Sequence, residues 1–361
     1  MKTKKKWSRK KKLIVAGIAL LTTILVIVLS AVLIIHSYIG KINIVNGSNP
    51  VPTIPDEQLQ PDPEDNTNLP DSSPSEISDV DRAIDDFINN SKLETKSSSD
   101  VFNILLIGID SRQNDNRGRS DSMMVVSVNK KSKKITVTSI MRDTYVHIPG
   151  HKNNRINAAF ALGGADLLME TVNINFKIKI DRYAYINFFS FIDIVNSVGG
   201  VTLDVSQKEI PVINKYVKEL NKLTGKPEKT DFLTTPGKLQ LNGKQALGYA
   251  RNRYVGNSDF ERTARQRRVF EQIFQKAKKL SIPKLNDLLN EILPDVTTNM
   301  PESEIFSYIL GAPGYLKYDL EQFRIPLDKA YKGLRVRGMA VLTIEFEKNV
   351  KALQDKIYGA E

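Results

Sequence analysis

The segment VFNILLIGIDSRQNDNRGRSDSMMVVSVNKKSKKITVTSIMRD, residues 101–143, determines the fold class of this chain. Residues 101–107 form a largely apolar run that ends at Gly108. Two further apolar runs, residues 122–128 and 135–140, are joined by a polar turn. Short apolar runs bounded by Gly and by polar turns are typical of buried strands. The segment therefore predicts three strands, of which the second and third form a hairpin.

Helical and strand patterns alternate in the rest of the chain. Helices are predicted at residues 157–162, 165–173, 188–198, 243–253, 258–280 and 348–358, and strands at 182–187, 201–205 and 341–346. Strands that alternate with helices indicate a layered α/β domain. Residues 207–236 are dense in Lys and other polar residues and are predicted to be an insertion. Ser258 and Glu261 have the spacing of a capping box, which predicts a helix start at that point.

The composition excludes several classes of protein. None of the 361 residues is Cys, so a disulfide framework, a Cys-ligated metal and a thiol nucleophile are excluded. The chain has no Walker loop, no G-x-G-x-x-G after a strand and no G-x-S-x-G elbow. His147 and His151 have the spacing of a zinc pair, but Pro149 and Gly150 break the helix that such a pair requires. We therefore expect both His residues in a surface loop.

The net charge of +11 is unevenly distributed along the chain. Residues 1–12 hold eight Lys and Arg and no acid, whereas residues 37–100 hold 13 acids and 4 bases. The segment after residue 100 is therefore strongly basic. A basic domain favours polyanionic partners such as nucleic acid, phosphoglycan or anionic lipid, although solvated surface Lys explains much of the excess.

An uncharged run near the N-terminus indicates a membrane anchor. Residues 13–35 are long enough to cross a bilayer as a helix. A cleavable signal peptide is the alternative, but the run is unusually long for one and no small-x-small site follows it. The positive-inside rule places residues 1–12 in the cytoplasm and everything after Tyr38 outside. The predicted order is a basic tail (1–12), a transmembrane helix (13–35), an extracellular Pro/Asp/Ser-rich linker with a short helix (36–99), and an extracellular domain (100–361).

Arg and Asp residues are concentrated just past predicted strand ends and at helix starts. They occur in the motifs IDSR (109–112), RGRSD (117–121), MRD (141–143), YARNR (249–253) and DFERTARQR (259–267). In an open α/β sheet, residues at strand ends converge on one crevice. Arg forks chelate phosphoryl oxygens, and two separated carboxylates can hold Mg²⁺. Each Arg taken singly is more typical of an ordinary surface ion pair, but the joint pattern reverses that interpretation and predicts a pyrophosphate site.

These motifs, in this order, resemble the LytR-CpsA-Psr family of extracellular, membrane-anchored phosphotransferases of mainly Gram-positive bacteria. The resemblance covers residues 100–361 together with the single-helix topology. It is carried by NILLIGIDSR (103–112), GRSD (118–121), SIMRDTYV (139–146), RINAAF (155–160), VGGV (198–201), LNG (241–243), ALGYARNR (246–253) and DFERTARQR (259–267). Met141 stands where the family often has Pro, a difference that removes no charged group.

The resemblance implies a fold and a set of site residues. The implied fold is an α-β-α sandwich with a central mixed sheet, in which a hydrophobic pocket takes a polyprenyl tail. The implied ligands of Mg²⁺ (or Mn²⁺) are Asp110 and Asp121. The implied pyrophosphate contacts are Arg119, Arg142, Arg251, Arg253, Arg262 and Gln266, and the implied catalytic residues are Arg119, Arg142, Asp121 and Arg253.

Three further expectations concern the helices around the site. Val269 and Ile273 share the helix face of Arg262 and are candidates for the prenyl pocket, with plain core packing as the alternative. Asp143 and Asp259 are weaker candidates, to orient Arg142 and to cap a helix. Arg251 and Arg253 are two positions apart and cannot share a helix face, so the helix is predicted to unwind around residues 251–254.

The implied reaction is transfer of a phosphoglycan, such as teichoic acid, capsule or a related wall polymer, from an undecaprenyl-pyrophosphate carrier to a peptidoglycan hydroxyl. The expected partners are that lipid-linked polymer, peptidoglycan and the cell membrane. A pyrophosphatase would use the same Arg and Asp residues and stays an alternative. A membrane-bound transcription regulator is a third interpretation, but an extracellular domain has no DNA to read. The general base stays open, because Arg remains protonated and a metal-bound Asp is a poor base.

Overall fold

The strands predicted at residues 101–140 form the middle of a seven-stranded sheet. The computed structural model describes residues 35–45, 69–109 and 120–360. β2 (Val101–Ile109) pairs antiparallel with β3 (Ser120–Asn129), and β3 pairs antiparallel with β4 (Lys134–Ile140). The predicted hairpin is therefore confirmed.

Four more strands extend this sheet in the order β1-β10-β7-β2-β3-β4-β11. β7 (Arg182–Ile186) is parallel to β2, and β11 (Asp319–Ile325) is parallel to β4. β10 (Thr297–Thr298) is antiparallel to β7, and β1 (Asn43–Ile44) is parallel to β10. Because parallel and antiparallel pairs occur together, the sheet is mixed, as expected.

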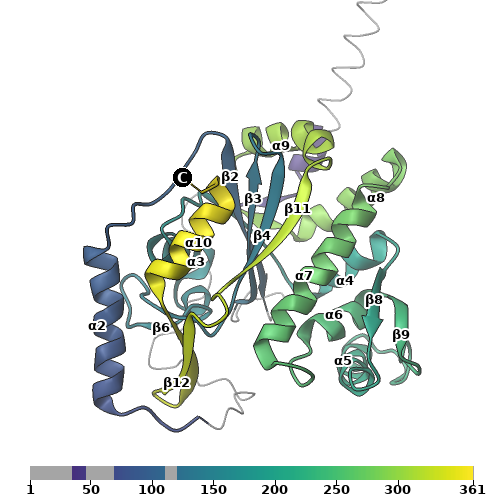
Figure 1. Ribbon diagram of the computed structural model, residues 1–361. Coiled ribbons are helices and arrows are strands. Elements are labelled where there is room, and N and C mark those ends of the chain that lie inside the picture. The colour runs from purple at the N-terminus through teal and green to yellow at the C-terminus, as the bar shows by residue number, and fades with distance from the viewer. Residues whose placement is uncertain (1–34, 46–68, 110–119, 361) are drawn as a thin grey trace, which may run out of the picture.

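Helices cover both faces of the sheet (Figure 1). α2 (Pro74–Asn90), α3 (Ala158–Phe176) and α10 (Phe346–Tyr358) pack on one face and enclose the main hydrophobic core. α7 (Ser258–Ala277) and α9 (Glu302–Tyr315) pack aromatic side chains against the other face. The predicted arrangement of helices on both sides of a central sheet is confirmed.

Two helices predicted at residues 157–162 and 165–173 form the single kinked helix α3. Gly163 and Gly164 have non-helical backbone angles inside it. Gly164 has φ of 70°, a region that a residue without Cβ adopts at little cost. The two glycines therefore form a kink that redirects the helix.

A smaller helical lobe, residues 188–257, has its own hydrophobic core. It consists of α4 (Phe188–Ser197), β8 (Val201–Val205), α5 (Ile210–Leu223), β9 (Gly237–Leu241) and α6 (Gly243–Arg251). The prediction of an insertion at residues 207–236 was wrong. α5 contributes the fully buried Ile213 and Val217 to the lobe core, and its Lys residues lie on the exposed side of an amphipathic helix.

The folded domain begins before the boundary predicted near residue 100. α2, the short helix predicted within residues 36–99, places Ile84 and Phe87 in the main core and starts at a capping box of Ser73 and Glu76. Ile35 and Ile39 pack with residues of α9. Among the described residues, no helix combines the length and the hydrophobicity needed to cross a bilayer, and the span predicted at residues 13–35 lies outside them except for Ile35.

The remaining elements frame the sheet edges. α8 (Ile282–Ile292) and a 3₁₀ turn (Leu293–Asp295) lead into β10. β5 (Tyr145–Val146) pairs with β6 (Asn154–Arg155), and β12 (Tyr331–Val336) forms a hairpin with β13 (Met339–Ile344). β13 and α10 confirm the late strand and the terminal helix.

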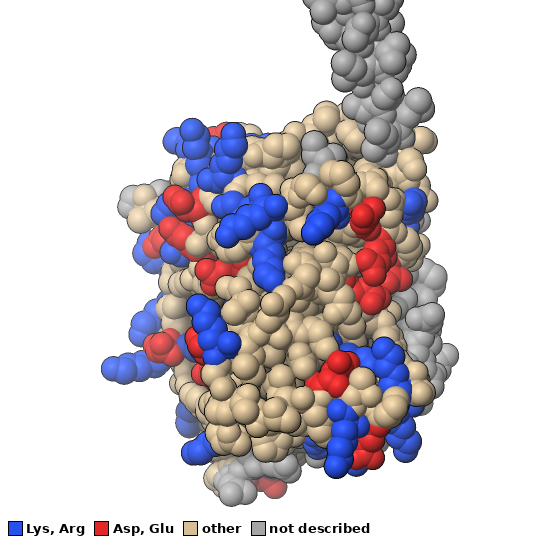
Figure 2. All heavy atoms as spheres, turned by 90° about the vertical axis from the view of Figure 1, so that its right-hand side faces the viewer, with Lys and Arg blue, Asp and Glu red and all other residues tan. Residues whose placement is uncertain are grey.

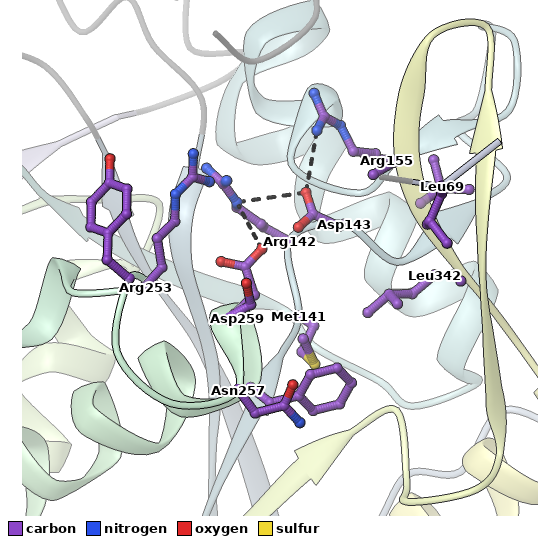
Figure 3. Close-up of a pocket in the computed structure, with 15 residues that line it drawn as sticks. Leu69, Met141, Arg142, Asp143, Arg155, Arg253, Asn257, Asp259 and Leu342 are labelled. Carbon is purple, nitrogen blue, oxygen red and sulfur yellow. Dashed lines mark hydrogen bonds and ion pairs between the residues drawn. The ribbon is translucent and has the colours of Figure 1, made fainter. Parts of the chain in front are cut away.

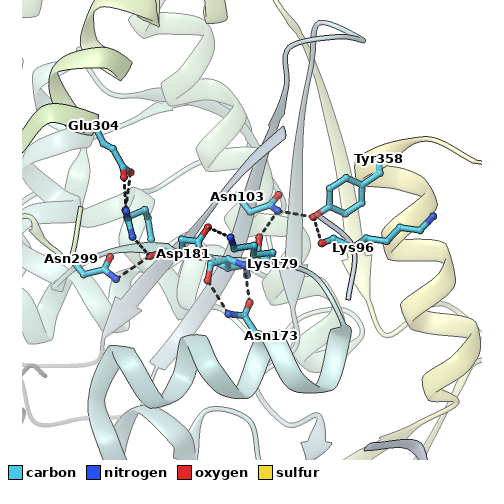
Figure 4. Close-up of polar contacts among 10 residues, drawn as sticks. Lys96, Asn103, Asn173, Lys179, Asp181, Asn299, Glu304 and Tyr358 are labelled. Atoms are coloured by element: carbon cyan, nitrogen blue, oxygen red, sulfur yellow. Dashed lines mark hydrogen bonds and ion pairs between the residues drawn. The ribbon is translucent and has the colours of Figure 1, made fainter. Parts of the chain in front are cut away.

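A polar network explains why Asn103 interrupts the apolar run of β2 (Figure 4). Its side-chain amide donates to the carbonyl of Lys179 at 2.8 Å and to the hydroxyl of Tyr358 at 3.0 Å. The Tyr358 hydroxyl in turn donates to the carbonyl of Lys96 at 2.9 Å. Since a buried amide is costly without partners, Asn103 fixes the C-terminal helix to the central strand.

The surface charge is broken into small groups on the face that carries α8 and the helical lobe. Lys and Arg side chains lie there in separate clusters, divided by uncharged surface and by Asp and Glu (Figure 2). A nucleic-acid backbone is followed by a continuous basic stripe. The described residues of this face form no such stripe.

Candidate active site

Buried Arg and Asp side chains meet at the sheet edge where β4 ends and β3 begins (Figure 3). β3 and β4 are antiparallel, so the start of one lies beside the end of the other. Asp121 comes from the start of β3, and Arg142 and Asp143 directly follow β4. The first turns of α7 add Asp259 and Arg262. Segments far apart in sequence thus supply one charged cluster.

Arg142 is the centre of this cluster. Its side chain is 6% exposed and faces three carboxylates. Nη1 donates a 2.9 Å hydrogen bond to Oδ1 of Asp121, while Nε lies 3.6 Å from Oδ1 of Asp143 and 3.6 Å from Oδ2 of Asp259. A planar guanidinium can serve several acceptors in this way, whereas a Lys ammonium acts as a point charge.

Two more buried Arg residues complete the pairing. Nη1 of Arg155 lies 3.4 Å from Oδ1 of Asp143, and Nη2 of Arg262 lies 3.1 Å from Oδ1 of Asp259. Both side chains are almost fully buried. Because a buried charge is costly unless it is paired, these ion pairs hold the cluster together.

The carboxylates titrate differently because their surroundings differ. Burial alone would raise the pKa of Asp121, but Arg142 and Arg262 outweigh it and lower that pKa. Burial and the neighbouring Asp259 together raise the pKa of Asp143 to about 7, against the opposing effect of Arg142. Burial also acts on Asp259, but Arg262 and a hydrogen bond from Asp143 lower its pKa well below the usual range. Asp143 and Asp259 therefore form a pair that shares one proton near neutral pH.

The connection between α6 and α7 brings two further Arg residues to the cluster. α6 ends at Arg251, and Asn252 is extended (φ −65°, ψ 118°), so the predicted unwinding is confirmed. The Arg251 guanidinium lies 4.2 Å from the ring centroid of Phe188 and 4.8 Å from that of Tyr216. Its charge helps to lower the pKa of Asp121, and the charge of Arg253 helps to lower the pKa of Asp259. Both charges reach the cluster, so the site attracts anions.

Apolar side chains on the adjoining sheet face are only partly covered. Leu105 and Val125 point to the main core and are fully buried, whereas their neighbours Leu106 and Met124 point to the α7 side and are half-buried. Central strands of a covered sheet are normally buried on both faces. Solvent therefore reaches apolar surface beside the Arg cluster, between the sheet and α7.

Comparison with known proteins identifies the family. The LytR_cpsA_psr family matches residues 72–356. The chain belongs to this family. The predicted resemblance is thereby confirmed, and the match begins beside α2, in agreement with the folded boundary.

Named relatives of this LytR-CpsA-Psr protein include cell-wall transferases. The polyisoprenyl-teichoic acid–peptidoglycan teichoic acid transferase TagU of Enterococcus faecalis is 39% identical over 210 residues, which span 56% of this chain and 62% of that relative. Biofilm regulatory protein A of Streptococcus mutans is 32% identical over 317 residues, or 79% of this chain and 76% of the relative. The structure of YwtF (TagT), a protein of Bacillus subtilis, with bound octaprenyl pyrophosphate lipid is 26% identical, with a TM-score of 0.53, and the match covers 75% of this chain and 95% of that one.

Not every predicted metal ligand and pyrophosphate contact can be located in this LytR-CpsA-Psr protein. Asp110 and Arg119 lie outside the described residues. Arg142, Arg253 and Arg262 are brought together, with Arg251 close enough to act on Asp121. Gln266 is half-buried one turn after Arg262 on α7.

The start of α7 differs from its prediction. No capping box forms: Asn257 is the N-cap, no side chain caps the helix, and Ser258 has a positive φ of 42°. Asp259 does not cap its helix, because its carboxylate pairs with Arg142 and Arg262. A residue ranked as a weak candidate is therefore a central member of the cluster.

Val269 and Ile273 lie away from the sheet. Val269 is 1% exposed in the core of the helical lobe, and Ile273 packs against the same core. The α7 side chains that reach the sheet are Phe270 and Phe274. This placement favours the plain core alternative for Val269 and Ile273.

The donor set around Asp121 fits a hard metal ion. Its carboxylate has a lowered pKa and is ionised at neutral pH, as Mg²⁺ requires. Ile109 pairs with Ser120, so the residues that precede Asp110 and Asp121 are neighbours across the β2–β3 ladder. Within residues 35–45, 69–109 and 120–360, no group of three or more His, Asp or Glu forms a metal site by itself.

Sequence reasoning missed Arg155 as a site residue. It lies in β6 and is 2% exposed, with its guanidinium directed to Asp143 (Figure 3). The signal was available, because Arg155 opens the quoted RINAAF motif, but an isolated Arg after a loop is normally a surface residue.

Proposed function

We propose that this LytR-CpsA-Psr protein is a membrane-anchored, extracellular phosphotransferase. It transfers a phosphoglycan, such as teichoic acid, capsule or a related wall polymer, from an undecaprenyl-pyrophosphate carrier to a hydroxyl of peptidoglycan. The observation that carries the proposal is the adjacency of a buried Arg cluster and an accessible apolar sheet face. A polyprenyl pyrophosphate has the same two parts, a charged head and an apolar tail.

The Arg side chains supply what the diphosphate head requires. Arg142 and Arg262 are held in place by buried carboxylates, and Arg251 is held between two aromatic rings. Preorganised guanidiniums stabilise charge that spreads over phosphoryl oxygens without reorganising during the reaction. The bound lipid in YwtF (TagT) supports a polyprenyl pyrophosphate as donor here.

Asp121, with Asp110, would hold Mg²⁺ or Mn²⁺. The metal, when bound, supplies positive charge that neutralises the phosphoryl oxygens of the diphosphate. The ionised state of Asp121 and its position at a strand end support this role. Its hydrogen bond from Arg142 also connects the metal ligand to the phosphate-binding cluster.

The reaction needs neither a covalent nucleophile nor an outside energy source. Phosphoryl transfer requires mainly positioning and charge neutralisation, so the lack of Cys in the sequence is no obstacle. The pyrophosphate bond of the donor supplies the free energy. The membrane anchor predicted at residues 13–35 keeps the domain beside a lipid that cannot easily leave the bilayer.

Reconstitution tests this function. The full-length protein in detergent is incubated with a short polyprenyl-pyrophosphate-linked saccharide, Mg²⁺ and peptidoglycan oligomers, and products are identified by mass spectrometry. We expect a saccharide joined to peptidoglycan through a phosphodiester, with release of polyprenyl phosphate. Phosphate release without a linked product would contradict the transferase and favour the pyrophosphatase. Protection of a C-terminal tag from protease in intact cells would contradict the extracellular orientation.

A further inference from the structure

A cleft of about 240 Å³ opens beside Arg142 (Figure 3), and Asp121 is not among the residues that line it. The Nη1 end of Arg142 faces Asp121, whereas Nε faces the pair Asp143 and Asp259 that forms the cleft floor. One wall is the β12–β13 hairpin and the other is the loop before α7. The wall residues used below are Gly333, Ala340 and Leu342 from the hairpin and Tyr254, Asn257 and Ser258 from the loop.

The size and lining of this cleft suit a small, neutral, polar molecule better than an isoprenoid chain. Ligand sites for drug-sized molecules have volumes of about 300–1,000 Å³, so this cleft takes a shorter group. The hairpin wall is uncharged, and the opposite wall offers polar side chains from Asn257 and Ser258. Tyr254 is 48% exposed at the rim. The Nζ of Lys215 lies 5.5 Å from the centroid of this ring. A partly exposed aromatic ring with nearby polar groups is an arrangement that can receive a sugar ring.

The hairpin wall is also coupled to the floor. The Leu342 backbone N–H donates to the Asp143 carbonyl at 2.8 Å. Asp143 is therefore fixed relative to whatever occupies the cleft. The Asp143 carboxylate lies near Nε of Arg142, whereas the metal ligand Asp121 lies at Nη1. A group that takes a proton from the acceptor should lie away from the metal ligand in this way.

We propose that this cleft binds the sugar that carries the acceptor hydroxyl, and that the Asp143–Asp259 pair accepts the proton of that hydroxyl. The inference rests on the proposed function and adds to it the acceptor site and the base. The acceptor oxygen forms a bond to the phosphorus that bears the glycan. The bond from that phosphorus to the bridging oxygen breaks, and polyprenyl phosphate leaves with the electron pair. The hydroxyl proton passes to the carboxylate pair.

The charges around the pair favour this role. Asp143 faces Arg142 on its own loop, Arg155 on β6 and Asp259 on α7, and Arg262 and Arg253 act on Asp259. Among its described lining residues, the hairpin brings no charged side chain into the cleft. With one proton bound the pair cannot accept another, so the pH at which Asp143 ionises, about 7, sets the pH above which transfer is fast.

The first experiment blocks the cleft in full-length protein. Ala340→Leu fills the hairpin wall, and Tyr254→Ala removes the exposed ring without threatening the fold. Lys332→Leu, an exposed position on β12 outside the cleft, is the matched control. With a polyprenyl-pyrophosphate saccharide as donor and peptidoglycan oligomers as acceptor, we expect the acceptor KM to rise about tenfold in both cleft variants. Donor binding and the control should stay unchanged.

The outcomes separate the two proposals. If the wild-type protein forms no linked product, the proposed function fails and the inference fails with it. If it forms product and both cleft variants keep the wild-type acceptor KM, the acceptor site is wrong while the function stands. Weakened donor binding in both variants, with acceptor KM unchanged, would assign the cleft to the donor and overturn the inference.

The second experiment tests the base. Asp143→Asn keeps the size and the hydrogen-bonding capacity of the side chain but cannot accept a proton. We expect kcat to fall about 100-fold or more with donor binding unchanged, which is the usual contribution of a general base. The rise of wild-type rate through pH 7 should disappear in the variant. A variant with wild-type kcat, or one that keeps the rise, would contradict the role of the pair.

Discussion

The two faces of the central sheet are built from alternating residues of the same strands, yet they differ in exposure. On the side of α3 and α10, Leu105 and Val125 have no exposed surface. On the side of α7, the adjacent Leu106 and Met124 stay half-buried, and the Arg cluster lies at the edge. We infer that the face on the side of α3 and α10 stabilises the fold, whereas the face on the side of α7 is left incompletely packed, as a ligand site requires.

The most direct way to break this comparison is to truncate adjacent leucines of β2. Leu105→Ala should lower the free energy of unfolding by about 3–5 kcal/mol, because it leaves a cavity in a closed core. Leu106→Ala should cost about 1 kcal/mol, because part of its surface is already exposed. Urea unfolding of the two variants measures both values. Equal losses would show that the α7 face is packed as tightly as the other. In a second assay, Leu106→Ala should weaken polyprenyl pyrophosphate binding and Leu105→Ala should not.

Arg142 lies at the edge of the incompletely packed face. Arg142→Lys should lower the transfer activity far more than the stability of the fold. The charge remains, but an ammonium cannot serve Asp121, Asp143 and Asp259 together. We expect transfer to fall about 100-fold, or about 2.7 kcal/mol of transition-state stabilisation. Arg268→Lys is the matched control, because Arg268 is an exposed partner of Glu261 on α7. Comparable losses in both variants would show a general effect of the Arg side chain.

The metal ligand should have the next largest effect. Asp121→Asn removes a charged oxygen donor while keeping the shape of the side chain. We expect the Mg²⁺ concentration for half-maximal transfer to rise about tenfold, with the unfolding transition little changed. A metal titration curve that coincides with that of the wild type would reject Asp121 as a ligand.

Arg253→Lys should have an effect of similar size, on activity instead of on the metal requirement. Arg253 lines the cleft and acts on Asp259 from a loop, so its replacement should leave the fold unchanged. We expect activity to fall about tenfold through loss of the guanidinium fork. Steady-state kinetics at saturating donor, together with thermal unfolding, tests both parts. An unimpaired variant would show that Arg253 is only part of a solvated basic surface.

The smallest predicted effect is a pH dependence of stability that comes from the site. An unfolded Asp has a pKa of about 3.9, and in the fold the pKa of Asp143 is raised to about 7. A raised pKa stabilises the fold through the bound proton, so this contribution is full below about pH 4 and is lost as pH rises through 7. Asp259, with a lowered pKa, contributes above about pH 4 and does not change further between pH 5 and 8.

Thermal unfolding at pH 5 and pH 8 measures this dependence. The wild-type Tm should fall between the two values, and Asp143→Asn should reduce the fall. Identical changes in Tm for the two proteins would contradict the raised pKa of Asp143. Such a result would also weaken the contrast between the fully buried face of the sheet and the edge that carries the Arg cluster.

The sequence predicted the fold best where local patterns coincide with burial. The run at residues 101–107 and the hairpin at 122–140 were identified because apolar residues and turn residues alternate cleanly. α5 was missed because its Lys residues masked the buried Ile213 and Val217. The apolar residues of α5 do have helical spacing, but the many Lys and other polar residues around them obscure that periodicity in the sequence.

The sequence predicted several residues of the site, but not which of them pair with one another. Arg142, Arg253 and Arg262 were identified from motifs, and the structure brings them together. Asp259 was read as a helix cap, since an acid in the first helical turn is usually explained by local hydrogen bonds. Its partner Arg142 comes from the segment after β4, and contacts between distant segments cannot be deduced from spacing. For the same reason the sequence left Val269 between a prenyl pocket and plain core packing, because a sequence defines a helix face but not what it contacts.

The short strand β1 limits the distance between the site and the end of the predicted anchor. β1 is hydrogen-bonded to β10, and Ile35 and Ile39 pack with residues of α9, so the Pro-rich residues 46–68 come after the point where the chain joins the domain. A long flexible linker between the anchor and the domain would let the domain reach peptidoglycan throughout the thickness of the wall. With residues 13–35 as the proposed anchor, β1 would hold the domain at a fixed distance from the membrane, and lengthening residues 46–68 would not change that distance. In the proposed reaction, the polymer is therefore joined to the peptidoglycan nearest the membrane.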